Sequence, residues 1–225
     1  METVLRPVAH MESEFSEKFG VPRQSGLVAQ LRGQVIFEPE FRTPDALRGI
    51  EGFSRLWLIW GFHMAHRETW AATVRPPRLG GNERMGVFAT RSPYRPNPIG
   101  LSCVELERVE WDSPRGPVLH VLGHDLVSGT PIYDIKPYLP YADAHPDARE
   151  GFAPPPAALE VEFPAHLLER VPKESRQALG GVLAQDPRPR YHSDPGRAYG
   201  MAFAGLEVKF TVDGKKLTVV DVERR

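Results

Sequence analysis

The chain has very little cysteine, with Cys103 as the one cysteine among 225 residues. A single cysteine excludes an internal disulfide, and with it the framework of small disulfide-rich secreted proteins. An excess of one charge is also lacking, because 28 lysines and arginines oppose 29 aspartates and glutamates and leave a net charge of −1. This balance excludes a globally basic nucleic-acid binder, although a local basic face remains possible.

Long apolar runs are missing as well. The strongest apolar stretch, residues 56–62, has seven residues, far fewer than the roughly 20 that a membrane-spanning helix needs. The first residues, Met1 to Val4, have neither the basic nor the apolar region of a secretion signal. We therefore expect a cytoplasmic protein with no membrane segment.

Several catalytic signatures are absent. The sequence has no glycine-rich dinucleotide or phosphate-binding motif, no G-x-S-x-G nucleophile motif and no C-x-x-C pair. His63 and His66 could supply two metal ligands, but no third ligand stands at a typical spacing, so we expect ordinary polar roles and no metal. Cys103 lies in a predicted strand with no obvious activating partner. We therefore expect it to be a small buried side chain and not a reactive thiol.

Proline and glycine are abundant, at 23 and 20 residues, and they predict many turns rather than long helices. Between them stand short apolar or alternating segments, which predict strands in a closed or strongly curved sheet. No β-α-β rhythm of the doubly wound kind is present. The predicted strands are residues 34–37, 56–63, 85–89, 101–109, 118–122 and 131–135.

The composition changes between residues 142 and 158, where acidic residues and the run Pro154 to Pro156 leave nothing to pack. We place a domain boundary there, with a mainly β, barrel-forming domain at residues 1–145, a Pro-rich linker at 146–157 and a smaller α+β domain at 158–225. In the second domain we expect strands at residues 160–163, 199–203, 208–212 and 217–222, and helices at 165–171 and 173–183.

The most unusual stretch runs from Gly86 to Ser102 and contains three prolines in six positions. Each proline fixes its own φ and extends the residue before it, so this loop is stiff and presents its side chains at low entropic cost. Arg91 and Arg95 offer planar donor forks, and Asn97 offers both a donor and an acceptor. The alternative is a polyproline-like crossover on the surface.

Three further loops could serve a ligand, although each could equally be a plain solvated turn. Residues 75–84 add Arg75, Arg78 and Arg84, so that two loops make a basic patch suited to phosphates in a neutral protein. Residues 123–131 hold Asp125, which can accept from an amine or ribose, beside Gly129. Residues 22–26 form a similar compact turn.

Taken together, these segments resemble one family. The motifs at residues 22–24, 53–63, 74–82, 86–102, 125–131 and 134–141, with Asp186 to Tyr191 near the end, are similar to those of the TsaA/YaeB-like proteins, now called TrmO. Arg190 stands where the family has a small residue, and Ser128 where a second aspartate is common. The resemblance covers most of residues 7–142 and indicates the full-length bacterial type.

The resemblance implies a β-barrel methyltransferase that uses S-adenosylmethionine and works as a homodimer. It also implies methylation of the exocyclic amine of threonylcarbamoyl-adenosine, next to the anticodon of a threonine tRNA. By position, the family's cofactor contacts fall on eleven residues of this sequence: Pro22, Arg23, Gln24, His63, Met64, Arg91, Leu101, Asp125, Leu126, Val127 and Ser128.

The remaining roles stay open at this point. The proton of the amine could go to His63, Tyr94 or Asp125, and no residue stands out. Arg75, Arg78 and Arg84 are candidates for tRNA phosphates, whereas Arg95, Asn97 and Lys136 are candidates for the modified base. Two other interpretations are an RNA-binding module without chemistry and a phosphoesterase that uses the same arginines.

Overall fold

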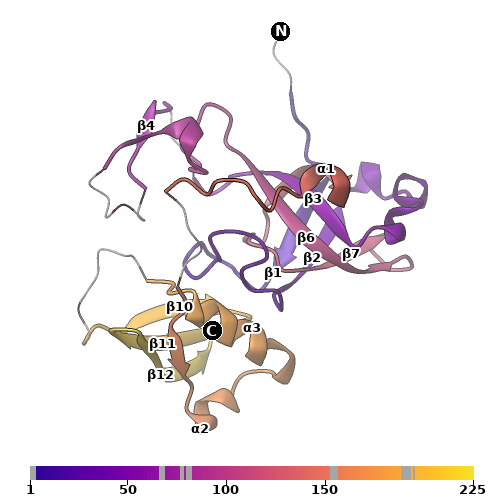
Figure 1. Ribbon diagram of the computed structural model, residues 1–225. Coiled ribbons are helices and arrows are strands. Elements are labelled where there is room, and N and C mark those ends of the chain that lie inside the picture. Colours follow the sequence, from indigo (N-terminus) through magenta and orange to yellow (C-terminus); the bar gives the residue numbers. More distant parts are fainter. Residues whose placement is uncertain are drawn as a thin grey trace.

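The computed structural model describes residues 4–65, 69–76, 79, 83–152, 157–188, 194 and 196–225. Its first part is a closed barrel of six strands in the order β1-β2-β7-β6-β3-β8, in which every pairing is antiparallel. The barrel occupies the upper right of Figure 1. Its strands are β1 (Ala9–Ser13), β2 (Arg32–Phe37), β3 (Arg55–Gly61), β6 (Ile99–Glu110), β7 (Val118–Leu122) and β8 (Pro131–Pro137).

Strand β6 shows how the sequence builds this barrel. Gly100, Ser102 and Val104 alternate toward the interior, as a strand with one buried face requires. The register against β7 shifts between Leu106 and Arg108. Before this shift the buried residues have even numbers, and after it the buried residue is Val109, which has an odd number. One extra residue therefore keeps apolar side chains inside while the strand bends around the barrel.

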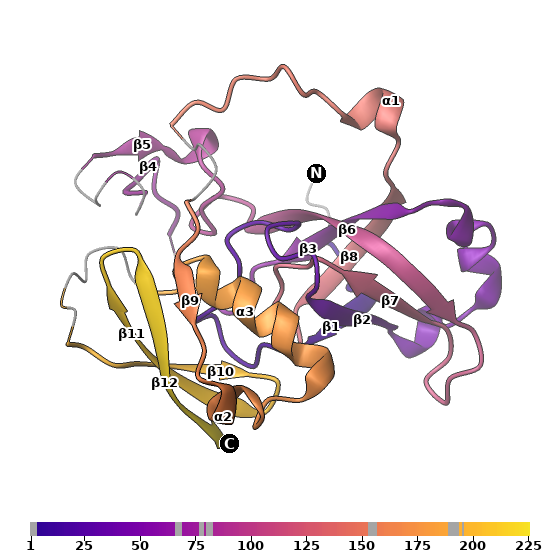
Figure 2. The same ribbon diagram turned by 60° about the horizontal axis from the view of Figure 1, so that its bottom comes forward.

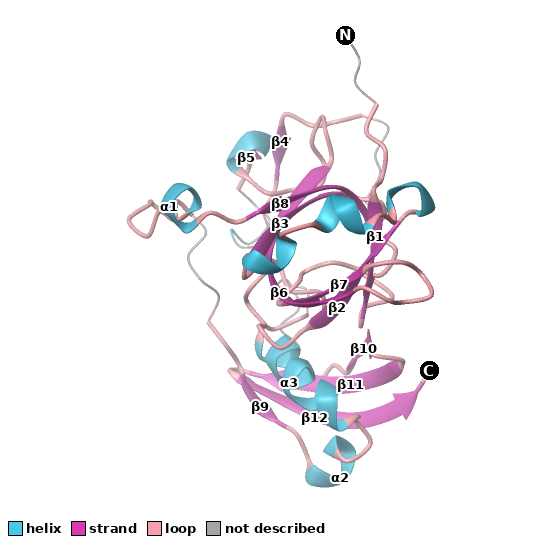
Figure 3. Cartoon of the chain, turned by 90° about the vertical axis from the view of Figure 1, so that its right-hand side faces the viewer, coloured by secondary structure: helices cyan, strands magenta, loops and turns pink. Residues whose placement is uncertain are grey.

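The second part is a four-stranded sheet with helices, in the order β10-β11-β12-β9. Helix α3 lies on the sheet face that is turned toward the barrel (Figures 2 and 3). The elements are β9 (Glu160–Glu162), α2 (Ala165–Leu168), α3 (Arg176–Ala184), β10 (Tyr199–Phe203), β11 (Leu206–Asp213) and β12 (Lys216–Arg224).

Two hydrophobic cores result, and the second crosses from one part to the other. The barrel core contains Leu56, Leu58 and Val104 among others. The core of the C-terminal sheet includes Phe15, Val28 and Leu31, which come from the loop between β1 and β2. Because buried apolar surface holds elements together, this loop fastens the sheet and α3 to the barrel.

The mainly β fold, with a barrel followed by an α+β region, is as the sequence predicts, but several local predictions were wrong. β1 was missed. The strand expected at residues 85–89 is only β5 (Met85–Gly86), which pairs with β4 (Thr73–Val74) and is followed by a 3₁₀ turn at Val87–Ala89. β3 ends at Gly61, two residues before the predicted end, and a short helix α1 (Pro140–Asp143) follows β8.

The predicted helices also differ in their ends. The helix expected at residues 165–171 stops at Leu168, and the one expected from residue 173 begins as a 3₁₀ turn at Lys173–Ser175. Helix α3 continues through Gly180 and Gly181 to Ala184. The missing side chain of Gly181 makes room for Val28, which an added methyl group would overlap. None of the described helices has the length and apolar character that crossing a bilayer requires.

Candidate functional site

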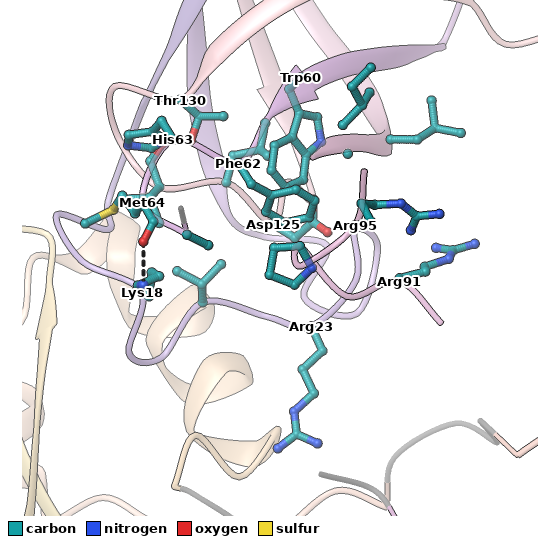
Figure 4. A pocket seen from close by; sticks show the side chains of 18 of the residues that line it. Lys18, Arg23, Trp60, Phe62, His63, Met64, Arg91, Arg95, Asp125 and Thr130 are labelled. Carbon is teal, nitrogen blue, oxygen red and sulfur yellow. Dashed lines mark hydrogen bonds between the residues drawn. The ribbon is translucent and has the colours of Figure 1, made fainter. Parts of the chain in front are cut away.

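A pocket of about 670 Å³ opens where four loops meet beside the ends of β3 and β6 (Figure 4). The loops are residues 18–24, the segment after β3, the Pro-rich loop before β6 and the loop before β8. Residues distant in the sequence therefore share one cavity. Its lining is Lys18, Val21, Pro22, Arg23, Gln24, Trp60, Phe62, His63, Met64, Ala65, Phe88, Arg91, Pro93, Arg95, Pro96, Asn97, Ile99, Gly100, Leu101, Asp125, Leu126, Val127 and Thr130.

A chain of hydrogen bonds runs through one wall of the pocket. The indole N–H of Trp60 donates to the Ser102 hydroxyl at 2.9 Å, and this hydroxyl donates to a carboxylate oxygen of Asp125 at 2.5 Å. Trp60 is 8% exposed and Ser102 is fully buried. Burial raises the pKa of the Asp125 carboxyl, and the hydrogen bond from Ser102 only partly opposes this effect. The wall thus holds a carboxyl that takes up a proton more readily than usual.

The loop that presents Asp125 is held by its neighbours. Gly123 has a φ of +72°, which suits glycine, and its N–H donates to the Leu31 carbonyl at 2.9 Å. His124 is buried, and its Nδ1 accepts from the N–H of Leu126 at 3.3 Å. The hydrogen therefore sits on Nε2, which lies 3.1 Å from both Glu14 and the Arg32 carbonyl. This network fixes the position of Asp125.

Cationic side chains stand around the pocket mouth. Arg91 donates to the side-chain oxygen of Gln24, which joins the Pro-rich loop to the loop of residues 18–24. Arg95 donates to the Thr90 carbonyl at 3.2 Å, and its guanidinium lies 6.0 Å from the centre of the Phe88 ring. Arg23 points away from Asp125 in Figure 4. The pocket therefore combines a carboxyl in its wall with a cationic rim.

Aromatic and apolar side chains supply the remaining surface. The rings of Trp60 and Phe62 meet edge to face with centroids 4.4 Å apart. Phe88, Met64 and Leu101 are 74%, 40% and 53% exposed, which is unusual for large apolar side chains beside a cavity. A flat apolar ligand could cover them.

Ten of the eleven predicted cofactor residues line this pocket. Ser128 does not, because its N–H donates to the Phe15 carbonyl at 2.8 Å and its hydroxyl accepts from the N–H of Ser13 at 3.4 Å. Of the candidates for the proton, His63 and Asp125 line the pocket, whereas Tyr94 is absent from its lining.

The predicted tRNA residues divide into two groups. Arg95 and Asn97 line the pocket. Arg75, Arg84 and Lys136 lie outside its lining: Arg84 donates to the Thr73 hydroxyl at 3.3 Å, and Lys136 lies 3.0 Å from Asp134 on β8. Arg78 falls outside the described residues, as does His66.

Sequence reasoning missed Trp60, Phe62, Ser102 and Lys18. A signal existed for Trp60 and Ser102, because both sit at the inward-facing positions of predicted strands, but an inward position also describes any core residue. Within the described part of the chain, no three histidine, cysteine, aspartate or glutamate side chains are grouped as metal ligands. Cys103 is half-buried rather than fully buried, and burial raises the pKa of its thiol while Arg55 opposes this effect.

Comparisons with known proteins match both parts of the chain. Residues 10–144 match the family model described as the tRNA-methyltransferase O N-terminal domain, and residues 156–225 match the TrmO C-terminal domain. The chain is 43% identical over 226 residues to a tRNA (adenine(37)-N6)-methyltransferase of Escherichia coli K12, covering 96% of this chain and 95% of that protein.

Two further similarities agree with these matches. A putative S-adenosylmethionine-dependent methyltransferase of Pseudomonas aeruginosa is 43% identical over 211 residues, covering 90% of this chain and 89% of that protein. A crystal structure of TrmO from the same species superposes with a TM-score of 0.81 at 38% identity, covering 100% of this chain and 98% of that one.

Proposed function

Because this chain belongs to the TrmO family, we propose that it transfers a methyl group from S-adenosylmethionine to the N6 amine of adenosine 37 in tRNA. The observation that supports this best is a buried carboxyl, Asp125, in the wall of a pocket whose rim is cationic and partly aromatic. We extend the proposal to one substrate: the threonylcarbamoyl-modified adenosine of a threonine-accepting tRNA.

The residues of the pocket fit S-adenosylmethionine. The aromatic and apolar surface of Trp60, Phe62 and Leu101 suits an adenine ring, and the rim guanidinium of Arg91 suits the carboxylate of the methionine portion. The pocket volume of about 670 Å³ lies within the roughly 300–1,000 Å³ of typical small-molecule sites. When bound, the cofactor supplies a methyl group on a positively charged sulfur.

In this proposal Asp125 receives the proton that the amine loses. Its raised pKa makes it a better proton acceptor than an exposed aspartate, and the Ser102 hydroxyl fixes one of its oxygens. His63 lines the same pocket and is the second candidate. The stiff Pro-rich loop and the His124 network hold the reacting groups in place, and such positioning can contribute roughly 7–11 kcal/mol to catalysis.

Two groups of cations give the tRNA its proposed contacts. Arg95 lines the pocket and would pair with the carboxylate of the threonylcarbamoyl group, with Asn97 beside it. Arg75, Arg84 and Lys136, which lie outside the pocket lining, would hold tRNA phosphates together with Arg78. The proposal also includes a homodimer and a cytoplasmic location, both of which the sequence resemblance implies.

The experiment compares methyl transfer to threonine tRNA with and without the threonylcarbamoyl group, measured by mass spectrometry of the nucleosides. We expect methyl transfer only to the modified tRNA, and Arg95→Ala should reduce this preference because the carboxylate loses its partner. Arg48→Ala is the matched control: Arg48 is exposed, is absent from the pocket lining and pairs with Asp45.

The alternatives give different results. Binding of tRNA without any methyl transfer would indicate an RNA-binding module, and release of a phosphate would indicate a phosphoesterase. Either result would overturn the proposed activity. Equal methylation of both tRNAs would overturn only the assignment of the threonylcarbamoyl substrate.

A further inference from the structure

A second, smaller cavity of about 190 Å³ lies where the loop of residues 18–27 meets the C-terminal end of α3. Its walls combine apolar side chains, such as Phe19, Leu27 and Val182, with polar and charged ones from Lys18, Arg23, Gln185 and Asp186. It shares Lys18, Val21, Pro22 and Arg23 with the main pocket, so the two cavities lie on either side of one short loop. Barrel and C-terminal sheet therefore build this cavity together.

One polar atom inside this junction lacks a partner. The side-chain oxygen of Gln185 is buried and finds no hydrogen-bond partner among the described residues. A buried acceptor without a donor is unfavourable, and native proteins usually satisfy such atoms. Gln185 lines the small cavity. Its oxygen is covered in this structure, and a turn of the side chain toward the cavity would let the N–H group of a ligand supply the missing donor.

The chain around Gln185 is held in an uncommon shape. Asp186, the next residue, has a φ of +53°, a left-handed conformation that non-glycine residues seldom adopt. Its carboxylate accepts from the Nε–H of Arg188 at 2.9 Å, and both side chains are largely covered. This turn ends α3 at the rim of the cavity and fixes where Gln185 stands.

We propose that this cavity binds the nucleobase of the nucleotide that neighbours the target adenosine in the tRNA. The proposal rests on the proposed function and deepens it, because it adds a second point of contact with the same substrate. Single-stranded RNA is commonly recognised by splayed bases that stack on side chains and hydrogen-bond through their edges. The apolar side chains of the wall suit the face of a base, and the Gln185 oxygen, once turned into the cavity, suits an N–H on the edge of that base.

The size of the cavity suits a single base, and the cations beside it suit the phosphate that such a base carries. The volume of about 190 Å³ equals the share of about six liquid waters and is smaller than the roughly 300 Å³ at which sites for larger small molecules begin. Lys18 and Arg23 stand on the loop between the two cavities, where a connecting phosphate would pass.

Binding is tested first, in a way that needs no catalysis. An anticodon stem-loop is prepared with the fluorescent base 2-aminopurine on one side of the target adenosine, and then on the other. We expect the fluorescence to change on binding at one of the two positions, because the base leaves its stack. In Gln185→Leu this change should be lost, whereas Gln177→Leu, the same substitution at an exposed position of α3, should retain it.

Kinetics supply the second test. Removing the neighbouring base should raise the KM for tRNA of the wild-type protein about fivefold to tenfold, the worth of one hydrogen bond and its packing. Gln185→Leu should show a similar rise with intact tRNA and no further rise with the abasic tRNA. A purely structural role would instead make the two effects multiply.

The wild type alone keeps the proposal falsifiable if Gln185→Leu fails to fold. Unchanged fluorescence at both positions, or an unchanged KM with both abasic tRNAs, would overturn it. If the wild type binds tRNA and transfers no methyl group, the proposed function fails, and the fluorescence result still decides whether the cavity takes a base.

Discussion

Asp125 has its carboxylate buried beside an indole and a serine hydroxyl, and such burial disfavours the charged form. A protein that needed only a hydrogen-bond acceptor at this position could use asparagine without that cost. The retained carboxylate is therefore consistent with a task that requires a proton acceptor.

Asp125→Asn should lower methyl transfer by about a hundredfold or more, the usual contribution of a general base. Its free energy of unfolding at neutral pH should equal or exceed that of the wild type, because asparagine still accepts from Ser102 and removes a buried charge. The measurements are the turnover rate and denaturant unfolding at several pH values. Asp45→Asn, at an exposed aspartate, is the control and should change neither quantity.

The sign of the pH dependence follows from the raised pKa. A carboxyl whose folded-state pKa is raised favours folding below its ordinary value of 3.8, and that benefit is lost as the pH rises through the folded-state value. The gain in stability from Asp125→Asn should therefore be complete at pH values above the folded-state pKa of Asp125, and it should vanish at pH values below 3.8. A stability difference that grew toward acid pH would contradict the assignment.

At the scale of elements, strands β3 and β6 shape the pocket wall through one close approach. Gly100 on β6 pairs with Trp60 on β3, and the indole ring lies over the glycine where any side chain would stand. This contact places the Trp60 N–H against Ser102, and through it against Asp125. The absence of a side chain at Gly100 thus lets Trp60 take the position from which its N–H reaches Ser102.

Gly100→Ala should destabilise the protein by about 1–3 kcal/mol, since the added methyl group overlaps the indole. It should also weaken binding of S-adenosylmethionine, because Trp60 must move out of the pocket wall. Thermal unfolding and calorimetric titration measure the two effects. Gly52→Ala is the matched control, because nothing lies near its added methyl group; a Gly100→Ala protein as stable as this control would refute the packing argument.

Some elements could be predicted from the sequence, and others depend on contacts between distant residues. The Pro-rich loop was predictable because its stiffness is local covalent chemistry, and β7 was predicted with its observed ends, Val118–Leu122. Strand β1 was missed because Ala9–Ser13 mixes small and polar residues and gains its regularity from β2 and β8. Ser128 shows the same limit: Ser13 and Phe15 turn it from the pocket, and no local pattern encodes those contacts.

At the scale of the whole molecule, the barrel and the C-terminal sheet share a core. Phe15 is fully buried, and its ring meets that of Phe203 on β10 edge to face with centroids 5.5 Å apart. On its other side it lies 6.2 Å from the ring of His124, beside the loop of Asp125. One side chain therefore connects the second sheet to the wall of the candidate site, and this predicts that the two parts unfold together.

Phe15→Ala should lower the free energy of unfolding by about 3–5 kcal/mol, the cost of truncating a fully buried phenylalanine, and should lower it for both parts alike. All four tryptophans lie within the first 111 residues, so their fluorescence follows the barrel, while hydrogen exchange in β11 and β12 follows the sheet. Because Phe15 packs on both sides, the two probes should give one midpoint in the wild type and one lower midpoint in the variant.

The control is Tyr141→Ala, which removes an 87% exposed ring and should change stability by no more than about 0.5 kcal/mol. Two separate midpoints in the wild type would show that the barrel and the sheet fold independently, and Phe15 would then stabilise only one of them.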